Sequence, residues 1–223
     1  ALEKYQNTDT KSETNLLKYF DHALKQRYIS PDRMDDFRNK GHNALKKYLA
    51  ARTDMFAANA KPEVDFKREG VILSSENKDT DAHLAGKIDR LEIDKEAKTV
   101  NIVDFKTGKP HSKWDREVKL LKYKQQLYFY KFLIEGSHTW SGYKVKEARL
   151  EFVEPDSEGN ILLPLQISFD SDDKSATALT TEAETKELIL SVWNKIKQLE
   201  LTSTDEYSED FKGARSFIEH LVS

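Results

Sequence analysis

Residues 100–111 read VNIVDFKTGKPH and place an aspartate and a lysine at the end of an apolar run. Alternate residues of a strand share a face, so Asp104 and Lys106 are expected side by side, with Phe105 pointing into the core. Charged groups usually stay in water. Other acid-x-lysine triplets occur, such as Asp65 to Lys67, and most triplets of this kind are solvated surface. The buried-looking strand distinguishes Asp104 and Lys106 from them.

The preceding segment offers a second carboxylate. Residues 84–94, LAGKIDRLEID, alternate in polarity, and a hairpin to the next strand would bring Asp89 close to Asp104 on one face. Two such carboxylates repel unless one is protonated or a cation lies between them. Oxygen ligands suit a hard divalent ion such as Mg or Mn. With Lys106 to orient or deprotonate a water, these are the parts needed for metal-assisted phosphodiester hydrolysis.

Composition limits the remaining possibilities. The 223 residues are 38% hydrophobic and 34% charged, as expected for one soluble globular domain. Lys and Arg number 36 against 39 Asp and Glu, so a nucleic-acid partner needs a local basic patch. The absence of cysteine excludes disulfides, thiolate zinc sites, iron–sulfur clusters and thiol nucleophiles, and it fits the reducing cytoplasm, where we expect the protein.

The ends and the apolar segments of the chain carry further expectations. No apolar stretch approaches the roughly 20 residues of a membrane span, and the start does not resemble a signal peptide, so no membrane association is expected. The chain begins at Ala1 in a polar segment without methionine, which suggests a piece cut from a longer protein.

Hydrophobic periodicity predicts two helices, three strands, a long helix, two strands and two helices, an α/β sandwich with a mostly antiparallel start. Residues 1–11 are polar and expected to be frayed. Strands within residues 64–108 are expected to form a three-strand meander. Residues 1–223 are expected to be one domain, with N-terminal helices in 1–60, the catalytic core in 63–170 and C-terminal helices in 180–223.

Helix signals locate the main helices. Ser30 and Pro31 predict the start of the second helix, because serine caps helices and proline suits their first position. This helix is expected to continue through Met55 and to end between Asn59 and Pro62. The later helices are expected at residues 114–135, 181–199, capped by Thr180 or Thr181, and 211–221.

Three motifs in order carry a family resemblance. They are GKIDR at residues 86–90, IVDFKTG at 102–108 and QLYFY at 126–130. Together they closely resemble the nuclease domain of the RecB-like branch of the PD-(D/E)XK superfamily, whose pattern is G-x-I-D-R, D-x-K-T-G and Q-x-x-x-Y. The resemblance spans about residues 41–130 and implies the fold of that superfamily, with a central mixed sheet flanked by helices.

The resemblance also implies roles for individual residues. Asp89, Asp104 and the carbonyl of Phe105 are expected to bind Mg or Mn, and Lys106 is expected to be catalytic. Gln126 and Tyr130 are expected to support the active-site side of the long helix.

Two further positions have alternative interpretations. His42 fits the H-x-x-L context of a metal-binding histidine, but Gly41, Leu45 and Tyr48 equally fit a version of the motif without it, which leaves His42 a plain polar helix residue. Glu63 fits an E-x-x-F element that extends the metal shell, although a glutamate beside a proline is commonly only a loop charge.

Other side chains near these motifs are assigned mainly structural roles. Arg90 either pairs with a core carboxylate or touches a phosphate, and we favour the pairing. Tyr123, Tyr128, Phe129 and Phe132 are expected in the core. A basic run beside the motifs is either solvated surface or a contact for the phosphate backbone, and it comprises Lys109, His111, Lys113, Lys119, Lys122 and Lys124.

The sequence departs from many RecB-like nucleases in lacking the four cysteines of an iron–sulfur cluster, and it also lacks helicase ATPase motifs. The resemblance implies a metal-dependent deoxyribonuclease for DNA end processing or recombinational repair, joined to a UvrD-like helicase region in its parent chain. Its DNA partner is expected to be single-stranded or to present duplex ends, with low sequence specificity. Two alternatives are an inactive nuclease fold that binds DNA or a protein, and a free-standing repair exonuclease.

Overall fold

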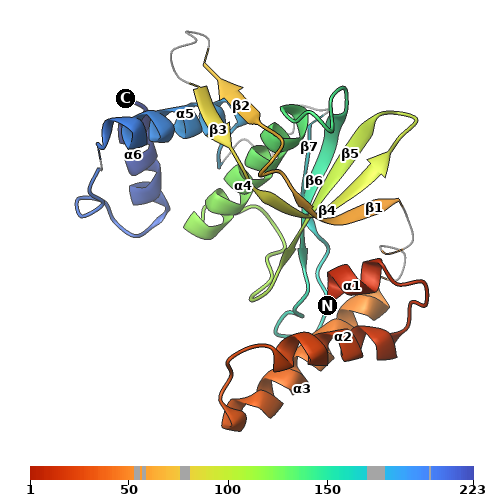
Figure 1. The fold of residues 1–223 in the computed structure, drawn as a ribbon. Coiled ribbons are helices and arrows are strands. Elements are labelled where there is room, and N and C mark those ends of the chain that lie inside the picture. Colours follow the sequence, from red (N-terminus) through yellow and green to blue (C-terminus); the bar gives the residue numbers. More distant parts are fainter. Residues whose placement is uncertain (53–55, 57–58, 76–80, 170–178, 201) are drawn as a thin grey trace.

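A five-stranded mixed sheet forms the centre of the computed structural model, which describes residues 1–52, 56, 59–75, 81–169, 179–200 and 202–223 (Figure 1). The strand order is β1-β4-β5-β6-β7, and only β5 and β6 pair in parallel. A central mixed sheet flanked by helices was predicted, and it is confirmed. The strands are β1 (Ala60–Asp65), β4 (Lys87–Asp94), β5 (Thr99–Lys106), β6 (Lys144–Phe152) and β7 (Leu165–Ser168).

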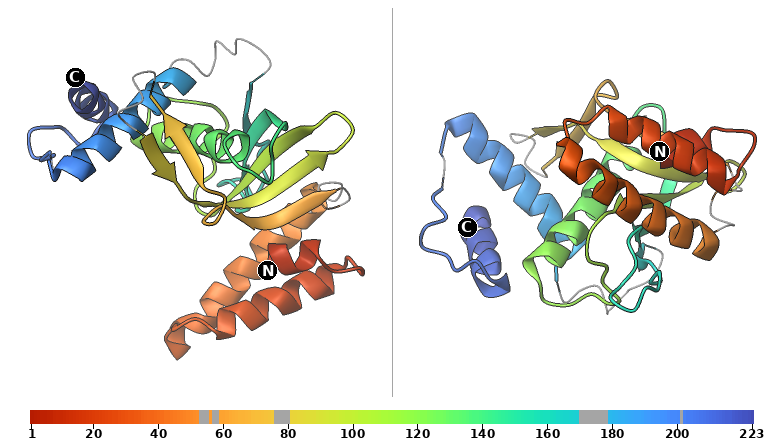
Figure 2. Two further views of the ribbon diagram at one scale, coloured as in Figure 1. Left: turned by 45° about the horizontal axis from the view of Figure 1, so that its top comes forward. Right: turned by 90° about the horizontal axis from the view of Figure 1, so that it is seen from below.

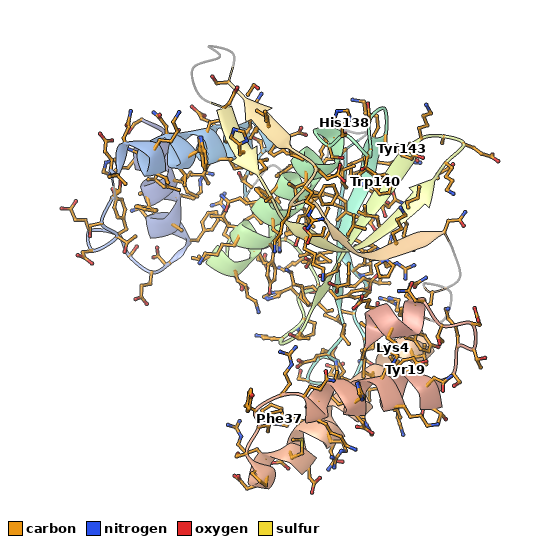
Figure 3. The ribbon with its side chains drawn as sticks, in the orientation of Figure 1. Lys4, Tyr19, Phe37, His138, Trp140 and Tyr143 are labelled. Atoms are coloured by element: carbon orange, nitrogen blue, oxygen red, sulfur yellow. The ribbon has the colours of Figure 1, made fainter. Side chains whose placement is uncertain are left out.

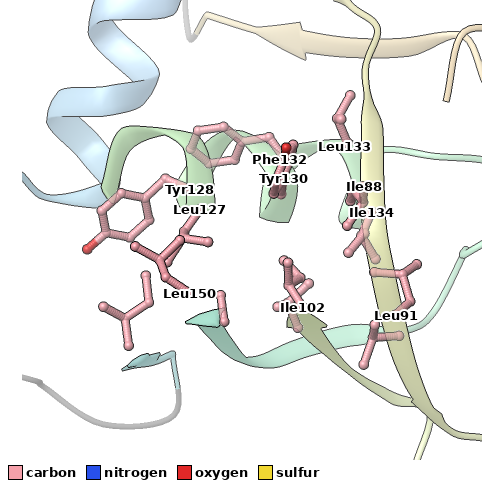
Figure 4. Packing of buried hydrophobic residues seen from close by; sticks show 14 of the residues in the cluster. Ile88, Leu91, Ile102, Leu127, Tyr128, Tyr130, Phe132, Leu133, Ile134 and Leu150 are labelled. Atoms are coloured by element: carbon pink, nitrogen blue, oxygen red, sulfur yellow. The ribbon is translucent and has the colours of Figure 1, made fainter. Parts of the chain in front are cut away.

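Helix α4 (Val118–Glu135) connects β5 to β6 and covers one face of the sheet. A parallel pair needs a crossover of this kind because its strands run in the same direction. The main core lies between α4 and the strands (Figure 4), where the fully buried Leu127 and Leu133 pack with Ile102 and Leu150. This packing holds the helix against the strand that carries Asp104 and Lys106. Tyr128 and Phe132 are buried, and Tyr123 and Phe129 are partly buried against the same core, as predicted.

The N-terminal arm consists of α1 (Leu2–Gln6), α2 (Glu13–Lys25) and α3 (Pro31–Ala51). It packs on a second core, in which Tyr48 of α3 contacts the edge of Phe105 at a ring separation of 6.2 Å. The prediction that residues 1–11 are frayed is wrong, because Tyr5 is 3% exposed and packs edge-on against Phe56. Apolar contact with the arm, which periodicity could not anticipate in so short a segment, orders this turn.

Helix α3 begins at Pro31 with Ser30 as its N-cap, as predicted. It ends at Ala51, earlier than expected, and Met55, which the prediction included, lies outside the described residues. The arm and the C-terminal helices lie on different sides of the sheet (Figures 1 and 2).

The predicted three-strand meander is wrong in its pairing. Strands β2 (Val71–Ser74) and β3 (Asp81–Leu84) form a separate hairpin, and β1 pairs with β4. The predicted strand is interrupted at Gly86, between β3 and β4. A Cβ added to Gly86 would lie only 2.8 Å from the side chain of Leu133 on α4, so the backbone passes close to this helix. Alternating polarity identifies strands, but it does not specify which strands pair.

The C-terminal helices are α5 (Glu182–Gln198) and α6 (Phe211–Val222). Thr181 caps α5 in a capping box with Glu184, which confirms one of the two predicted caps. Helix α5 packs against α4 and the β2–β3 hairpin. None of the described helices combines the length and the apolar character that a membrane crossing requires.

Candidate active site

Three neighbouring strands carry a carboxylate in one cross-strand row. Arg90 pairs with Val103 across β4 and β5, so the adjacent positions, Asp89 and Asp104, face each other. Pro62 pairs with Arg90 across β1 and β4, which puts Glu63 opposite Asp89. We call Glu63, Asp89 and Asp104 the carboxylate row.

The two aspartates of the carboxylate row lie in a poorly solvated place. Oδ2 of Asp89 accepts a hydrogen bond of 2.9 Å from the backbone N–H of Phe105, which fixes its carboxylate beside β5. Asp104 is 3% exposed. Burial raises the pKa of both carboxyls, and the charge of Asp104 raises the pKa of Asp89 further. Burial thus disfavours the ionised form of both carboxyls, even with Lys106 close to Asp104.

Lys106 and α4 enclose Asp104 in a hydrogen-bonded ring. Nζ of Lys106 lies 2.6 Å from Oδ2 of Asp104 and donates to Oε1 of Gln126 at 2.6 Å. Nε2 of Gln126 donates to the hydroxyl of Tyr130 at 2.7 Å, and that hydroxyl donates to Oδ1 of Asp104 at 3.1 Å. Asp104 thus accepts a hydrogen bond at Oδ1 and has an ion-pair partner at Oδ2, and the amide of Gln126 has one orientation that satisfies both of its neighbours.

The helix period explains this arrangement. Gln126 and Tyr130 are four residues apart on α4 and therefore lie on the same face, turned toward β5. Tyr123 lies one turn earlier, and Nζ of Lys106 sits over its ring at 4.3 Å from the centroid. The sequence assigned Tyr123 only to the core. Its position three residues before Gln126 was the available indication that it also contacts the site.

The remaining predicted site residues lie at different distances from this ring. Glu63 lines the same cavity as Asp89, forms an ion pair with Lys87 and has a left-handed backbone at φ 54°. His42 is not brought to the carboxylate row, since its Nε2 lies 2.8 Å from Oδ1 of Asp21 on α2. The carbonyl of Phe105 belongs to the strand between Asp104 and Lys106, and the side chain turns to the opposite face, toward the arm.

A cavity of about 700 Å³ opens from the carboxylate row toward the N-terminal arm. Glu63 and Asp89 line its sheet end, and Phe37 and Lys40 of α3 line its other wall. Arg90 also lines the cavity, but its guanidinium is 1% exposed and pairs with Glu92 at 3.3 Å. The favoured structural interpretation of Arg90 is confirmed by this pairing.

The basic run after β5 is split between surface and core. Lys124 is 0% exposed and lies over the ring of Tyr128, so its assignment to a surface patch is wrong. Helix geometry turns this position inward, which the composition of the run did not reveal. His111 is half-buried against Phe152, and burial lowers its pKa. The exposed members of the run are Lys109, Lys113, Lys119 and Lys122.

The donor set at the carboxylate row suits a hard divalent cation. Among the residues that the structure describes, no three His, Cys, Asp or Glu side chains converge on one point. Asp89 and Asp104 nevertheless supply carboxylate oxygens on one face, and such oxygens are the ligands that hard divalent cations prefer. The two residues that would hold such an ion are Asp89 and Asp104, with Glu63 as the nearest further carboxylate of the row.

Comparison with known proteins agrees with this geometry. The family model described as "PD-(D/E)XK nuclease superfamily" matches residues 1–216. No curated protein is significantly similar to the chain. Nucleases of this superfamily generally use divalent metal ions, and the mixed sheet described above is consistent with their fold. Because the match covers nearly the whole chain, including the carboxylate row and α4, the protein belongs to the PD-(D/E)XK nuclease superfamily.

Proposed function

We propose that this protein is a Mg- or Mn-dependent deoxyribonuclease that hydrolyses phosphodiester bonds. The observation that carries the proposal is the hydrogen-bonded ring, which holds Lys106 beside Asp104, the residue that faces Asp89 across β4 and β5. A lysine needed only for charge balance would be satisfied by Asp104 alone. Here Gln126 and Tyr130 fix both partners, as expected where a reacting group must be preorganised.

Each residue has a separate task in the proposed reaction. A divalent ion held by Asp89 and Asp104 would stabilise negative charge on the phosphate and would lower the pKa of a bound water, which makes that water a better nucleophile. Lys106 orients the attacking water and offsets negative charge that develops on the phosphate. Gln126 holds the Lys106 amine at 2.6 Å, and the hydrogen bond from Tyr130 favours the ionised form of Asp104 against the effect of burial on its pKa. The exposed lysines between β5 and α4 contact the phosphate backbone without reading bases.

The biological setting follows from the motif order described above, which resembles the RecB-like branch. We propose that residues 1–223 form one domain, with the catalytic core in 63–170, attached to a UvrD-like helicase region in the parent protein. Its role would be DNA end processing or recombinational repair in the cytoplasm. Cleavage from ends, rather than at internal positions, is part of the proposal.

Substitution of the two central residues tests the activity. Asp104→Ala and Lys106→Ala should each lower cleavage of end-labelled single-stranded DNA in Mn at least about 100-fold, because each removes a group from the reaction. Lys197→Ala, which removes an exposed lysine near the end of α5 and outside both the hydrogen-bonded ring and the basic run, is the matched control and should keep most of the activity. Circular dichroism melting establishes that the variants are folded. Unchanged cleavage in both alanine variants would refute the assignment.

A binding measurement separates an active nuclease from an inactive one. Calorimetric titration of Mn into the wild-type protein should give binding heat that Asp89→Ala abolishes. If no heat depends on Asp89 and no DNA is cut, the chain is a nuclease fold that only binds DNA or another protein. Circular single-stranded DNA in a parallel assay distinguishes cleavage from ends, which leaves circles intact, from internal cleavage.

A further inference from the structure

The cavity beside the carboxylate row has a wall that phosphate chemistry does not explain. Its volume of about 700 Å³ lies within the range of roughly 300–1,000 Å³ typical of pockets for small organic ligands. Besides Asp89 and Glu63 at its sheet end, it is lined by the rings of Phe20 and Phe37 and by Leu45. A phosphodiester backbone alone would require cations here, not aromatic side chains.

Phe37 is the unusual member of this lining. It is 40% exposed, while Phe56 in the same lining is 4% exposed and belongs to the core under the arm. Figure 3 shows Phe37 on the N-terminal arm, beyond the end of the sheet. A large apolar ring that is both exposed and directed into a cavity points to a ligand more readily than to packing.

The charges around Phe37 match a nucleic-acid strand. The guanidinium of Arg33, one helical turn earlier on α3, lies over the ring of Phe37 at 5.0 Å. Lys40, one turn later, lines the cavity with it. The carboxylates of the cavity lie away from this face of α3: Glu63, Asp89 and Glu154 belong to the sheet side, and Glu3 belongs to α1. Among the α3 residues that line the cavity, Phe37 is the aromatic one and Lys40 is the charged one.

We propose that this cavity holds an unpaired nucleobase of the substrate strand, stacked on Phe37, with Arg33 and Lys40 beside the adjoining phosphates. The proposal rests on the nuclease function proposed above, since the cavity is continuous with Asp89. Bases stack on aromatic side chains with little dependence on sequence, because every base has a π-face. A base within a duplex would first have to leave its stack. Phe37 thus acts as a specificity-determining residue that favours unpaired over paired DNA near the cleaved bond.

Binding without cleavage tests the proposal. Fluorescence anisotropy in EDTA compares a labelled single-stranded oligonucleotide with a strand of equal length that carries sugars and phosphates but no bases. Wild-type protein should bind the intact strand about tenfold more tightly, in line with the usual value of one base stacked on an aromatic ring. Phe37→Ala should lose this preference and bind both strands as weakly as wild type binds the abasic one. Phe37→Trp should keep it.

A matched variant and a defined set of outcomes make the test decisive. Tyr28→Ala removes a fully exposed aromatic side chain that does not line the cavity, and its preference for bases should equal that of wild type. Equal affinity of wild type for both strands, or an equal loss for both strands in Phe37→Ala, would overturn the proposal. Because no cleavage is measured, a protein that prefers bases in EDTA but never cuts DNA would contradict the proposed function alone.

Discussion

Asp104 is buried, and each of its two carboxylate oxygens has a different partner. Lys106 lies against one of its oxygens and Tyr130 donates to the other. Gln126 links these two partners, so each of the four side chains of the ring is held by two others. Burial and the neighbouring Asp104 carboxylate raise the pKa of the Tyr130 hydroxyl, which keeps it protonated as a donor. This explains why a glutamine and a tyrosine four residues apart accompany the aspartate and lysine.

Substitution of Asp89 tests whether its ionised carboxylate destabilises the metal-free fold. Asp89→Asn keeps an oxygen that can accept from the N–H of Phe105 but removes the charge. A carboxyl with a raised pKa in the folded state stabilises the fold below its unfolded pKa, and that contribution is lost as the pH rises through the folded pKa. In metal-free buffer, Asp89→Asn should therefore be more stable than wild type at pH 7, with the difference shrinking toward pH about 4.

Urea unfolding at a series of pH values in EDTA measures this difference. Added Mn should reverse the order at neutral pH, because an ion present at a hundredfold excess over its Kd stabilises wild type by about 2.7 kcal/mol and does not stabilise a variant that cannot bind it. If the difference in unfolding free energy between Asp89→Asn and wild type does not change with pH, ionisation of Asp89 does not destabilise the fold.

Gly41 explains how helices α2 and α3 pack closely. An added Cβ at this position would lie 2.0 Å from Cζ of Phe20, so only glycine lets the ring rest on α3. The sequence motif that contains Gly41, Leu45 and Tyr48 thus has a packing basis: Leu45 and Tyr48 enter the second core, and Gly41 admits the neighbouring helix. The same contact places Phe20 in the lining of the cavity.

Gly41→Ala should destabilise the protein by about 1–3 kcal/mol, because the overpacking cost exceeds the roughly 1 kcal/mol that alanine gains over glycine in a helix. Urea unfolding measures the change. Phe20→Leu in the same chain should recover part of the loss by making room for the methyl group. Asn43→Ala, an exposed change on the same helix, is the control and should cost nothing comparable. A neutral or stabilising Gly41→Ala would refute the close contact.

Besides the second core, a network of charged side chains attaches the N-terminal arm to the sheet. Glu151 of β6 is 2% exposed and accepts from Arg149 at 3.2 Å, from Arg52 at 3.3 Å and from the hydroxyl of Tyr48 at 3.5 Å. Arg149 also reaches Glu92 of β4 at 2.7 Å. This network joins the end of the arm to two strands. It therefore fixes the position of the α3 wall of the cavity relative to the carboxylate row.

Removal of Glu151 should have a large effect on the whole fold. Glu151→Ala removes the buried carboxylate that Arg149 and Arg52 share, and breaking a buried pair typically costs about 3–5 kcal/mol. Hydrogen exchange should accelerate in α3 more than in α4, because the arm loses its attachment while the main core remains. Glu147→Ala is the matched control, since that carboxylate is partly exposed and contacts only the edge of Arg149 at 3.4 Å. It should cost less than about 1 kcal/mol. Equal losses in the two variants would contradict a docking role for Glu151.

Much of the architecture and the centre of the site could be predicted from local pattern. Alternation along β5 placed Asp104 beside Lys106, and the four-residue spacing on α4 placed Gln126 and Tyr130 on one face. These relations depend only on the periods of the strand and the helix. Such periods involve residues a few positions apart, so they can be recognised in the sequence. The order of the periodic segments predicted an α/β fold, and the resemblance of the three motifs to a known family implied the mixed sheet with flanking helices.

Contacts between distant segments were decided by the tertiary structure. The order of Tyr5, the separate β2–β3 hairpin and the burial of Lys124 depend on which surfaces meet, and a periodic pattern leaves that open. The same holds for His42, which lies against Asp21, and for the cavity between Phe37 and Asp89. The sequence thus determined the chemistry that each element can present, and packing between elements decided which of those groups lie close enough to act together.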